Sequence, residues 1–213
     1  MALATYTDLK ASVADFLHQS NMTSQIPDFI KLCETELNNL LSVRMMEQTD
    51  TLACVVSSRN IALPTGFLSP IDLWVAADTS SVRQWITPLG ADNIPNNVSS
   101  AFPRAWTIDG SNILLDSPAD VAYPAYFRYR KGFDLATDST NWLLTNFPNV
   151  YLYGTLMQAA PYMLEDPRIQ TWQMFYERGI TILQRSDHKN KSPAILTTEI
   201  AQMRQSGYDI RRG

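Results

Sequence analysis

Residues 141–185 read NWLLTNFPNVYLYGTLMQAAPYMLEDPRIQTWQMFYERGITILQR, and this stretch decides the fold that the sequence predicts. Asn146 and Pro148 indicate a helix start, because asparagine caps backbone amides and proline is tolerated in the first turn. Pro161 should kink or end this helix. Its apolar side carries Val150, Tyr153, Met157, Ala160 and Leu164, which recur every few residues.

A second helix is predicted directly afterwards, with Asp166 as its cap and Pro167 as its first residue. Its apolar set is Ile169, Trp172, Phe175 or Tyr176, Ile180 and Leu183. The two helices form a hairpin. A lone hairpin leaves much of each apolar stripe in water, so both faces need a further partner.

Two more amphipathic helices are predicted near the N-terminus. Thr7 should cap the first, and Ser24 should cap the second, which has Pro27 in its first turn. The first carries an apolar stripe of Leu9, Val13, Phe16 and Leu17. The second carries Phe29, Ile30, Cys33, Leu37, Leu40, Leu41 and Met45. Glu34 and Glu36 are expected to lie off that face. Four stripes from both ends of the chain favour one helical bundle.

Between Asp50 and Gly132 the apolar residues alternate, which predicts strands. The alternating segment TLACVVS and the later RNIALP suggest a hairpin through Ser57 and Ser58. Asp109-Gly110 is a second hairpin signal. Short links and frequent prolines predict about five to six antiparallel strands. The expected fold class is α+β: a helical bundle with an inserted small antiparallel β-sandwich or partly closed barrel.

The chain divides into four predicted segments. The N-terminal helices occupy 1–49, the β insert 50–135, the helical hairpin 136–189 and a C-terminal docking tail 190–213. The polar stretch from Asp187 to Pro193 is expected to be a helix end or hinge. The extended tail has few apolar residues and more basic than acidic ones, so it should be disordered or become ordered by docking on another surface.

The composition argues against several classes of protein. A net charge of −4 disfavours a general nucleic-acid-binding surface, which needs clustered cations. Cys33 and Cys54 belong to no CxxC or ligand set, so both are expected to be buried free thiols. No apolar run suits a signal peptide or a membrane span, which predicts a protein kept in a reducing cytoplasm.

We find no sequence motif for catalysis. Glycine-rich phosphate loops, GxSxG and HExxH are absent, so no enzyme, cofactor or metal site is predicted. His18 and His188 are expected to be surface residues near helix ends. Helix capping explains Glu165 and Asp166 better than acid–base chemistry does, because adjacent residues do not face the same way.

The β region is rich in aromatic residues, namely Trp74, Trp85, Trp106, Tyr123, Tyr126, Phe127 and Tyr129. Packing in cores and interfaces is their expected role, since the basic residues of a nucleic-acid platform are few. Alternation should place Arg128 and Arg130 on one face, where they can pair with acids of a neighbour. An alternative from another class is a carbohydrate-binding module or small hydrolase with its site among Trp74, Trp85, Trp106 and Tyr126.

Several motifs together resemble one family. They are LPTGF at 63–67, PRAWTIDGSNILLDSPA at 103–119, and above all NWLLTNFP at 141–148 followed by YLYG at 151–154. The matching positions are Leu63, Pro64, Gly66, Phe67, Pro103, Gly110, Asn141, Trp142, Leu143, Pro148, Tyr151, Leu152, Tyr153, Ala160 and Asp166. The chain resembles the head-to-tail adaptor, or connector, proteins of tailed bacteriophages, particularly the podovirus-type adaptor beside the portal. The arginine-rich end of the last helix is only partly present, as Arg185, Lys189 and Lys191.

The resemblance implies a virion protein without enzymatic activity, made in the host cytoplasm and placed in the neck between portal and tail. It implies a ring of about twelve copies that binds the portal protein and extends the channel for passing double-stranded DNA without binding it specifically. Tail or nozzle proteins would attach below, with no membrane involved. Another phage neck or tail-completion ring protein is the alternative within phages.

The same resemblance implies that the C-terminal segment reaches the portal. Its apolar anchors would be Ile195, Leu196, Ile200, Met203, Tyr208 and Ile210. The arginines that would meet acidic portal residues are Arg204, Arg211 and Arg212. Ordering such a segment on binding lowers the affinity per contact, so rings would not form before the portal is present.

Overall fold

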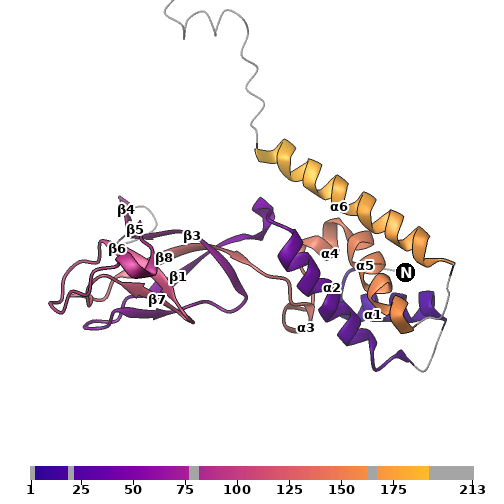
Figure 1. Ribbon diagram of the computed structural model, residues 1–213, viewed down its shortest axis with the longest axis horizontal. Coiled ribbons are helices and arrows are strands. Elements are labelled where there is room, and N and C mark those ends of the chain that lie inside the picture. The colour runs from indigo at the N-terminus through magenta and orange to yellow at the C-terminus, as the bar shows by residue number, and fades with distance from the viewer. Residues whose placement is uncertain (1–2, 19–21, 77–81, 163–166, 192–213) are drawn as a thin grey trace, which may run out of the picture.

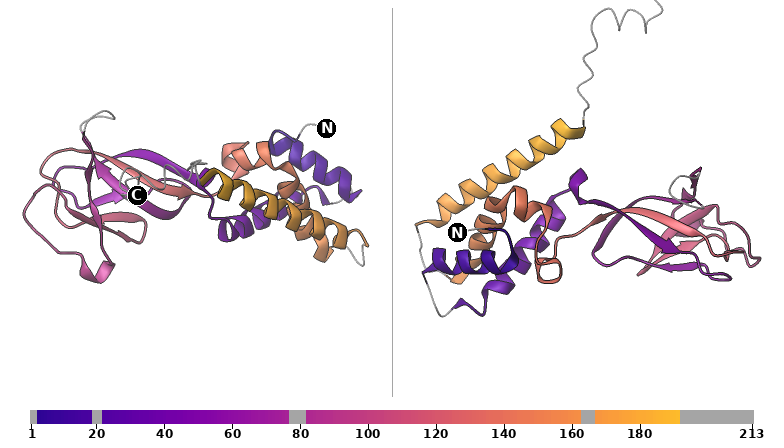
Figure 2. Two further views of the ribbon diagram at one scale, coloured as in Figure 1. Left: turned by 90° about the horizontal axis from the view of Figure 1, so that it is seen from above. Right: turned by 180° about the vertical axis from the view of Figure 1, so that it is seen from behind.

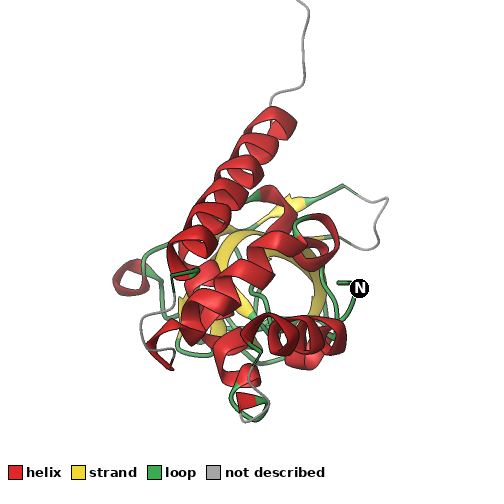
Figure 3. Ribbon diagram, turned by 90° about the vertical axis from the view of Figure 1, so that its right-hand side faces the viewer, coloured by secondary structure: helices red, strands yellow, loops and turns green. Residues whose placement is uncertain are grey.

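The computed structural model describes residues 3–18, 22–76, 82–162 and 167–191. In these ranges the fold is mixed α+β, as predicted. Helices from both ends of the chain form one end of an elongated molecule, and the strands form the other (Figure 1; Figure 2). Viewed along the long axis, the helices stand in front of the strands (Figure 3). We call these regions the helical part and the β part.

The helical part is built on six α-helices within the described ranges. They are α1 (Tyr6–Leu17), α2 (Ile26–Leu40), α3 (Leu135–Asp138), α4 (Trp142–Asn146), α5 (Pro148–Ala159) and α6 (Ile169–Lys191). Short 3-10 turns are η2 (Arg44–Met46) and η4 (Ala160–Tyr162). One hydrophobic cluster includes buried residues from α1, α2, α5 and α6, such as Leu9, Phe29, Leu156 and Leu183. The two ends of the chain therefore share one core.

The N-terminal helices begin at other caps than predicted. Thr5, not Thr7, caps α1: its hydroxyl accepts from Asp8 N at 3.2 Å, while the Asp8 carboxylate accepts from Thr5 N at 3.0 Å. This reciprocal pair satisfies two free amides, which Thr7 could not do. α2 follows Gln25, which makes no side-chain cap, and the predicted cap Ser24 instead donates to the Gln25 side chain.

The predicted start at Asn146 is also wrong. Asn141 caps the short helix α4 by accepting from Leu144 N at 2.9 Å, and Asn146 ends that helix. α5 then begins at Pro148, after Phe147. Pro161 lies in the turn that ends this helix, as predicted. α6 starts at Ile169, two residues after Pro167, and the predicted cap Asp166 lies outside the described residues.

Helix α5 packs closely between α2 and α6 because of two glycines. A Cβ atom on Gly154 would lie 2.6 Å from Cys33 Sγ on α2 and 2.9 Å from a Tyr176 ring carbon on α6. A Cβ on Gly179 of α6 would lie 2.8 Å from a Val150 methyl carbon on α5. Real Cβ contacts are longer than this, so both glycines are required by the spacing of the helices.

The β part contains two four-stranded sheets. The strands are β1 (Glu47–Ala53), β2 (Asn60–Ala62), β3 (Phe67–Val75), β4 (Gln84–Trp85), β5 (Thr87–Pro88), β6 (Ala105–Asp109), β7 (Asn112–Leu115) and β8 (Pro124–Lys131). A 3-10 turn, η3 (Ala91–Asn93), lies between β5 and β6. The strand orders are β1-β8-β3-β4 and β2-β7-β6-β5. The described strands form two separate open sheets and no closed barrel, so the predicted alternative of a partly closed barrel is not confirmed.

The pairing of the strands differs from the prediction in two places. β1 pairs with β8 and β2 pairs with β7, so the predicted hairpin through Ser57 and Ser58 does not form. β5 pairs with β6 in parallel, so the β part is not purely antiparallel. The second predicted hairpin is confirmed: β6 and β7 are joined at Gly110, whose φ of 56° lies in the left-handed region.

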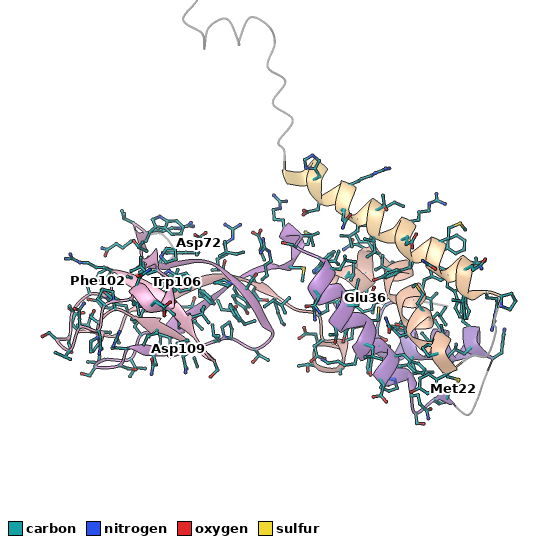
Figure 4. The ribbon with its side chains drawn as sticks, in the orientation of Figure 1. Met22, Glu36, Asp72, Phe102, Trp106 and Asp109 are labelled. Carbon is teal, nitrogen blue, oxygen red and sulfur yellow. The ribbon has the colours of Figure 1, made fainter. Side chains whose placement is uncertain are left out.

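The core of the β part lies between its two sheets. Phe127 on β8 is completely buried, and its ring meets that of Trp106 on β6 edge to face, with centroids 5.7 Å apart. Trp106 also donates from Nε1 to Ile86 O at 3.0 Å. Figure 4 shows Trp106 within the β part, far from Met22 in the helical part. The hydrophobic clusters of the two parts share no residue.

Candidate interaction surfaces

The predicted docking residues lie outside the described part of the chain, which ends at Lys191. They are Ile195, Leu196, Ile200, Met203, Arg204, Tyr208, Ile210, Arg211 and Arg212. α6 continues to Lys191, so the helix end or hinge expected between Asp187 and Pro193 does not interrupt it before that residue. The described part of α6 is 23 residues long and reaches the last described residue.

One face of α6 holds this helix on the core. Trp172, Tyr176, Ile180 and Leu183 are buried, so the apolar position left open between Phe175 and Tyr176 belongs to Tyr176. Phe175 stacks on Tyr153 of α5 instead, with ring centroids 5.0 Å apart. The outer face keeps two large apolar side chains in solvent, Met174 and Ile182.

Glu36 joins three helices from the surface of the helical part (Figure 4). Its carboxylate on α2 accepts from Gln158 Nε2 of α5 at 2.7 Å and from the Tyr176 hydroxyl of α6 at 3.2 Å. Its predicted place off the apolar face of α2 agrees with its exposure. The contact fixes α6 against the other helices by polar as well as apolar interactions.

Glu34, by contrast, is buried, although it was expected off the apolar face. Its Oε1 accepts from Leu135 N at 2.7 Å and from the Tyr151 hydroxyl at 3.3 Å. Burial raises the pKa of the Glu34 carboxyl, while the Leu135 amide partly opposes that shift. Asn141 completes the network by donating to the Tyr151 hydroxyl at 2.7 Å. This network ties α2 to the start of α3 and to α5.

A signal for the burial of Glu34 is present in the sequence. Ile30, Cys33, Glu34 and Leu37 follow the spacing of one helix face, so Glu34 falls inside the apolar stripe rather than beside it. Charge alone suggests a surface position. The Leu135 amide and the Tyr151 hydroxyl, both far along the chain, donate hydrogen bonds to the carboxylate and so allow it to be buried.

A hollow of about 490 Å³ lies between the end of α1 and the start of α6. Its lining is Asp15, Phe16, His18, Tyr153, Arg168, Thr171, Trp172 and Phe175. Arg168 bridges the two helices: it donates to Phe16 O at 3.0 Å, and its guanidinium carbon lies 5.1 Å from the centre of the Trp172 ring. His18 is the left-handed residue that ends α1, in agreement with its predicted place at a helix end.

The outer face of the β1-β8-β3-β4 sheet carries an aromatic row. Trp74 stacks on Tyr126 at 5.8 Å and lies 5.1 Å from Trp85, while the Arg83 guanidinium covers its ring. Trp106 belongs to the other sheet and is buried, so the four residues of the alternative carbohydrate or hydrolase site do not share one surface. Trp85 is the only one of the four that is more than half exposed, at 56%.

The charged residues beside this row follow the predicted alternation. Arg128 and Arg130 share one face of β8, since Phe127 and Tyr129 between them are buried on the other. The Arg128 guanidinium pairs with the Glu47 carboxylate on β1, as expected for a face with acids on a neighbour. Arg128 is therefore paired within the sheet, whereas Arg130 donates to the Ser69 hydroxyl on β3 at 3.2 Å.

The described residues hold no constellation for catalysis that we can identify. No group of three His, Cys, Asp or Glu side chains in these ranges is arranged to hold a metal ion. Cys33 and Cys54 are buried free thiols, as predicted, and burial raises the pKa of Cys54 to about 11. Glu165 and Asp166 lie outside the described residues, whereas His188 is exposed on α6. Among the described helices, none combines the length and apolar character of a bilayer-crossing segment.

These features define the class as an α+β protein whose described part combines helices anchored on one core with exposed contact surfaces. The sequence comparison identifies the family. Residues 4–197 match the family model of the SU10 adaptor protein, and because this covers most of the chain, the protein belongs to that family of bacteriophage adaptor proteins. A search of curated proteins finds no match. The family is one of structural virion proteins of the phage neck.

Proposed function

We propose that this chain is a head-to-tail adaptor of the podovirus type, which forms a ring below the portal, extends its DNA channel and gives tail or nozzle proteins a platform. Membership of the adaptor family is the observation that carries the proposal. A closed ring of about twelve copies requires two different contact faces on each copy. In this proposal a helical bundle (1–49 and 136–189) carries the inserted β-sandwich (50–135), and 190–213 is the docking tail.

The tail is the proposed contact with the portal. Its first two residues, 190 and 191, belong to α6, and α6 is fixed to the core by Trp172, Tyr176 and Leu183. A docked tail would therefore hold the whole helical part in place. The apolar residues from Ile195 to Ile210 would supply buried contacts, and Arg204, Arg211 and Arg212 would pair with acidic portal residues.

The proposed channel wall does not bind the passing DNA specifically. The net charge of −4 supports this, because a lumen rich in cations would hold phosphates during packaging and ejection. The proposal involves no catalytic step and no cofactor. The adaptor would act through its shape and its contacts alone.

Mixing the purified chain with portal rings of the same phage tests the proposal. We expect a monomer alone and a portal-bound ring of about twelve copies after mixing, measured by size exclusion with light scattering. A chain ending at Lys191 should lose binding. Arg211→Glu with Arg212→Glu should weaken it, whereas Arg178→Glu on the exposed side of α6 is the matched control and should not.

Each other outcome contradicts a stated part of the proposal. Equal binding by the shortened chain would remove the tail from the contact. Binding to tail proteins but not to portal would favour another neck or tail-completion ring protein. Rings of the chain without portal would show that the ring contact is complete in the free protein.

A further inference from the structure

The helical part and the β part are connected twice along the chain. The outgoing connection, residues 41–46, leads from α2 to β1, and the return connection, residues 132–134, leads from β8 to α3. Leu41, Val43, Met46 and Phe133 are buried in the helical core. The direction in which the β part projects depends on how these two connections are held.

Asn38 of α2 holds the return connection from two sides. Its side-chain oxygen accepts from Phe133 N at 2.7 Å, and its Nδ2 donates to Phe133 O at 3.2 Å. The preceding residue, Gly132, donates to Gly66 O at 2.8 Å, which ties the connection to the loop before β3. A side chain of α2 therefore fixes the backbone where β8 leaves the sheet.

The outgoing connection is held by the other end of the chain. Asp187 of α6 accepts through Oδ1 from Arg44 N at 2.8 Å. Arg44 opens the turn η2, and no side chain of the preceding residue Val43 caps that turn. A carboxylate is a strong acceptor for such an amide. Arg44 lies three residues before Glu47, the first residue of β1.

We propose that Asp187 is a latch: it couples the C-terminal end of α6 to the direction in which the β part leaves the helical part. The contact joins residues 143 positions apart in the chain. It also lies just before residues 192–213. The latch itself does not depend on portal docking; its consequence, that a docked tail orients the β part, rests on the proposed function.

Spin labels on the free protein measure the latch directly. Ala11→Cys on α1 and Thr51→Cys on β1 place labels on exposed positions of the two parts, while Cys33 and Cys54 remain buried. Asp187→Ala should broaden the distribution of label distances and remove the protection of the Arg44 amide against hydrogen exchange. Glu177→Ala is the control: it removes another exposed carboxylate of α6, which accepts from Gln173, and should change neither.

The outcomes separate the latch from the proposed function. An unchanged distance distribution in Asp187→Ala, or equal broadening in Glu177→Ala, would overturn the latch. If Asp187→Ala fails to fold, Asp187→Asn should still lower the protection of the Arg44 amide, and unchanged protection there would also overturn it. If the full chain and the chain ending at Lys191 bind the portal equally well, the docking proposal is refuted. The measurements of the latch remain valid, because they use the free protein.

Discussion

The helical part and the β part bury their cores in different ways. In the helical part, backbones approach closely at Gly154 and Gly179, and one carboxylate, that of Glu34, is buried within hydrogen-bond reach of its partners. In the β part, aromatic rings fill the space between two sheets, with Phe127 at the centre. At these two glycines the helical core has no room for an added Cβ, whereas the centre of the β core is filled by the Phe127 and Trp106 rings. The two should therefore fail under opposite substitutions.

Removing a ring from the β core should have the largest effect. Phe127 is completely buried and its ring lies within 5.8 Å of Phe67, Trp106 and Tyr129. Phe127→Ala should lower the free energy of unfolding by about 3–5 kcal/mol. Denaturation followed by tryptophan fluorescence measures this loss, because three of the five tryptophans, Trp74, Trp85 and Trp106, lie in the β part.

Two comparisons sharpen this prediction. Tyr126→Ala, on the half-buried outer face of the same strand, should cost clearly less than Phe127→Ala. The helical signal in circular dichroism should shift less than the fluorescence, since the two hydrophobic clusters share no residue. Equal shifts of both signals would show that the two parts unfold as one unit.

Adding atoms to the helical core should have the next largest effect. A Cβ on Gly154 would lie 2.6 Å from Cys33 Sγ, so Gly154→Val must separate α5 from α2 and should cost about 3 kcal/mol. Urea denaturation followed by circular dichroism measures the cost. The double variant Gly154→Val with Cys33→Ala should lose less stability than the sum of the two single variants. If the two losses of stability are strictly additive, the contact with Cys33 is not the cause.

The sequence predicted the helical part better than the β part, because helix periodicity is local. The spacing of Trp172, Ile180 and Leu183 identified the buried side of α6. The exact ends of the helices depend on which of several neighbouring residues forms the cap. Thr5 caps α1 in place of Thr7, because Thr5 and Asp8 together satisfy two backbone amides.

Strand pairing needs information that a short stretch does not contain. The turn at Gly110 could be predicted, since both of its strands adjoin it. The partner of β1 could not, because Glu47 pairs with Arg130, far along the chain. The same limit applies to the candidate surfaces: the contact between Asp187 and Arg44 joins two segments whose sequences give no sign of each other.

A smaller effect is expected from the buried carboxylate. Glu34→Ala leaves the Leu135 amide and the Tyr151 hydroxyl without this acceptor, so it should cost about 2 kcal/mol. Glu36→Ala is the matched control on the exposed side of α2 and should cost less. A larger cost for the Glu36 variant would contradict the importance assigned to the buried network.

The same residue predicts a dependence on pH. Burial raises the pKa of Glu34 in the folded state, so the folded protein holds this proton more tightly than the unfolded chain. The stability that the protonated Glu34 side chain contributes is complete below the ordinary carboxyl pKa. It is lost as pH rises through the raised pKa of Glu34 in the folded state. Urea denaturation across that window should show stability falling more steeply in the native protein than in Glu34→Gln, and parallel curves would contradict this assignment.

The smallest effect is expected in the one hairpin that the sequence predicted correctly. Gly110 has a φ of 56° and open space around it, so Gly110→Ala introduces backbone strain without a clash and should cost about 1 kcal/mol. Gly90→Ala is the matched control, because Gly90 has a φ of −65° and its added Cβ would make only an ordinary contact, 3.7 Å from Asn93 Nδ2. Thermal unfolding of the two variants compares them directly. An equal loss in both would mean that the glycine to alanine change, rather than the left-handed turn between β6 and β7, sets the cost.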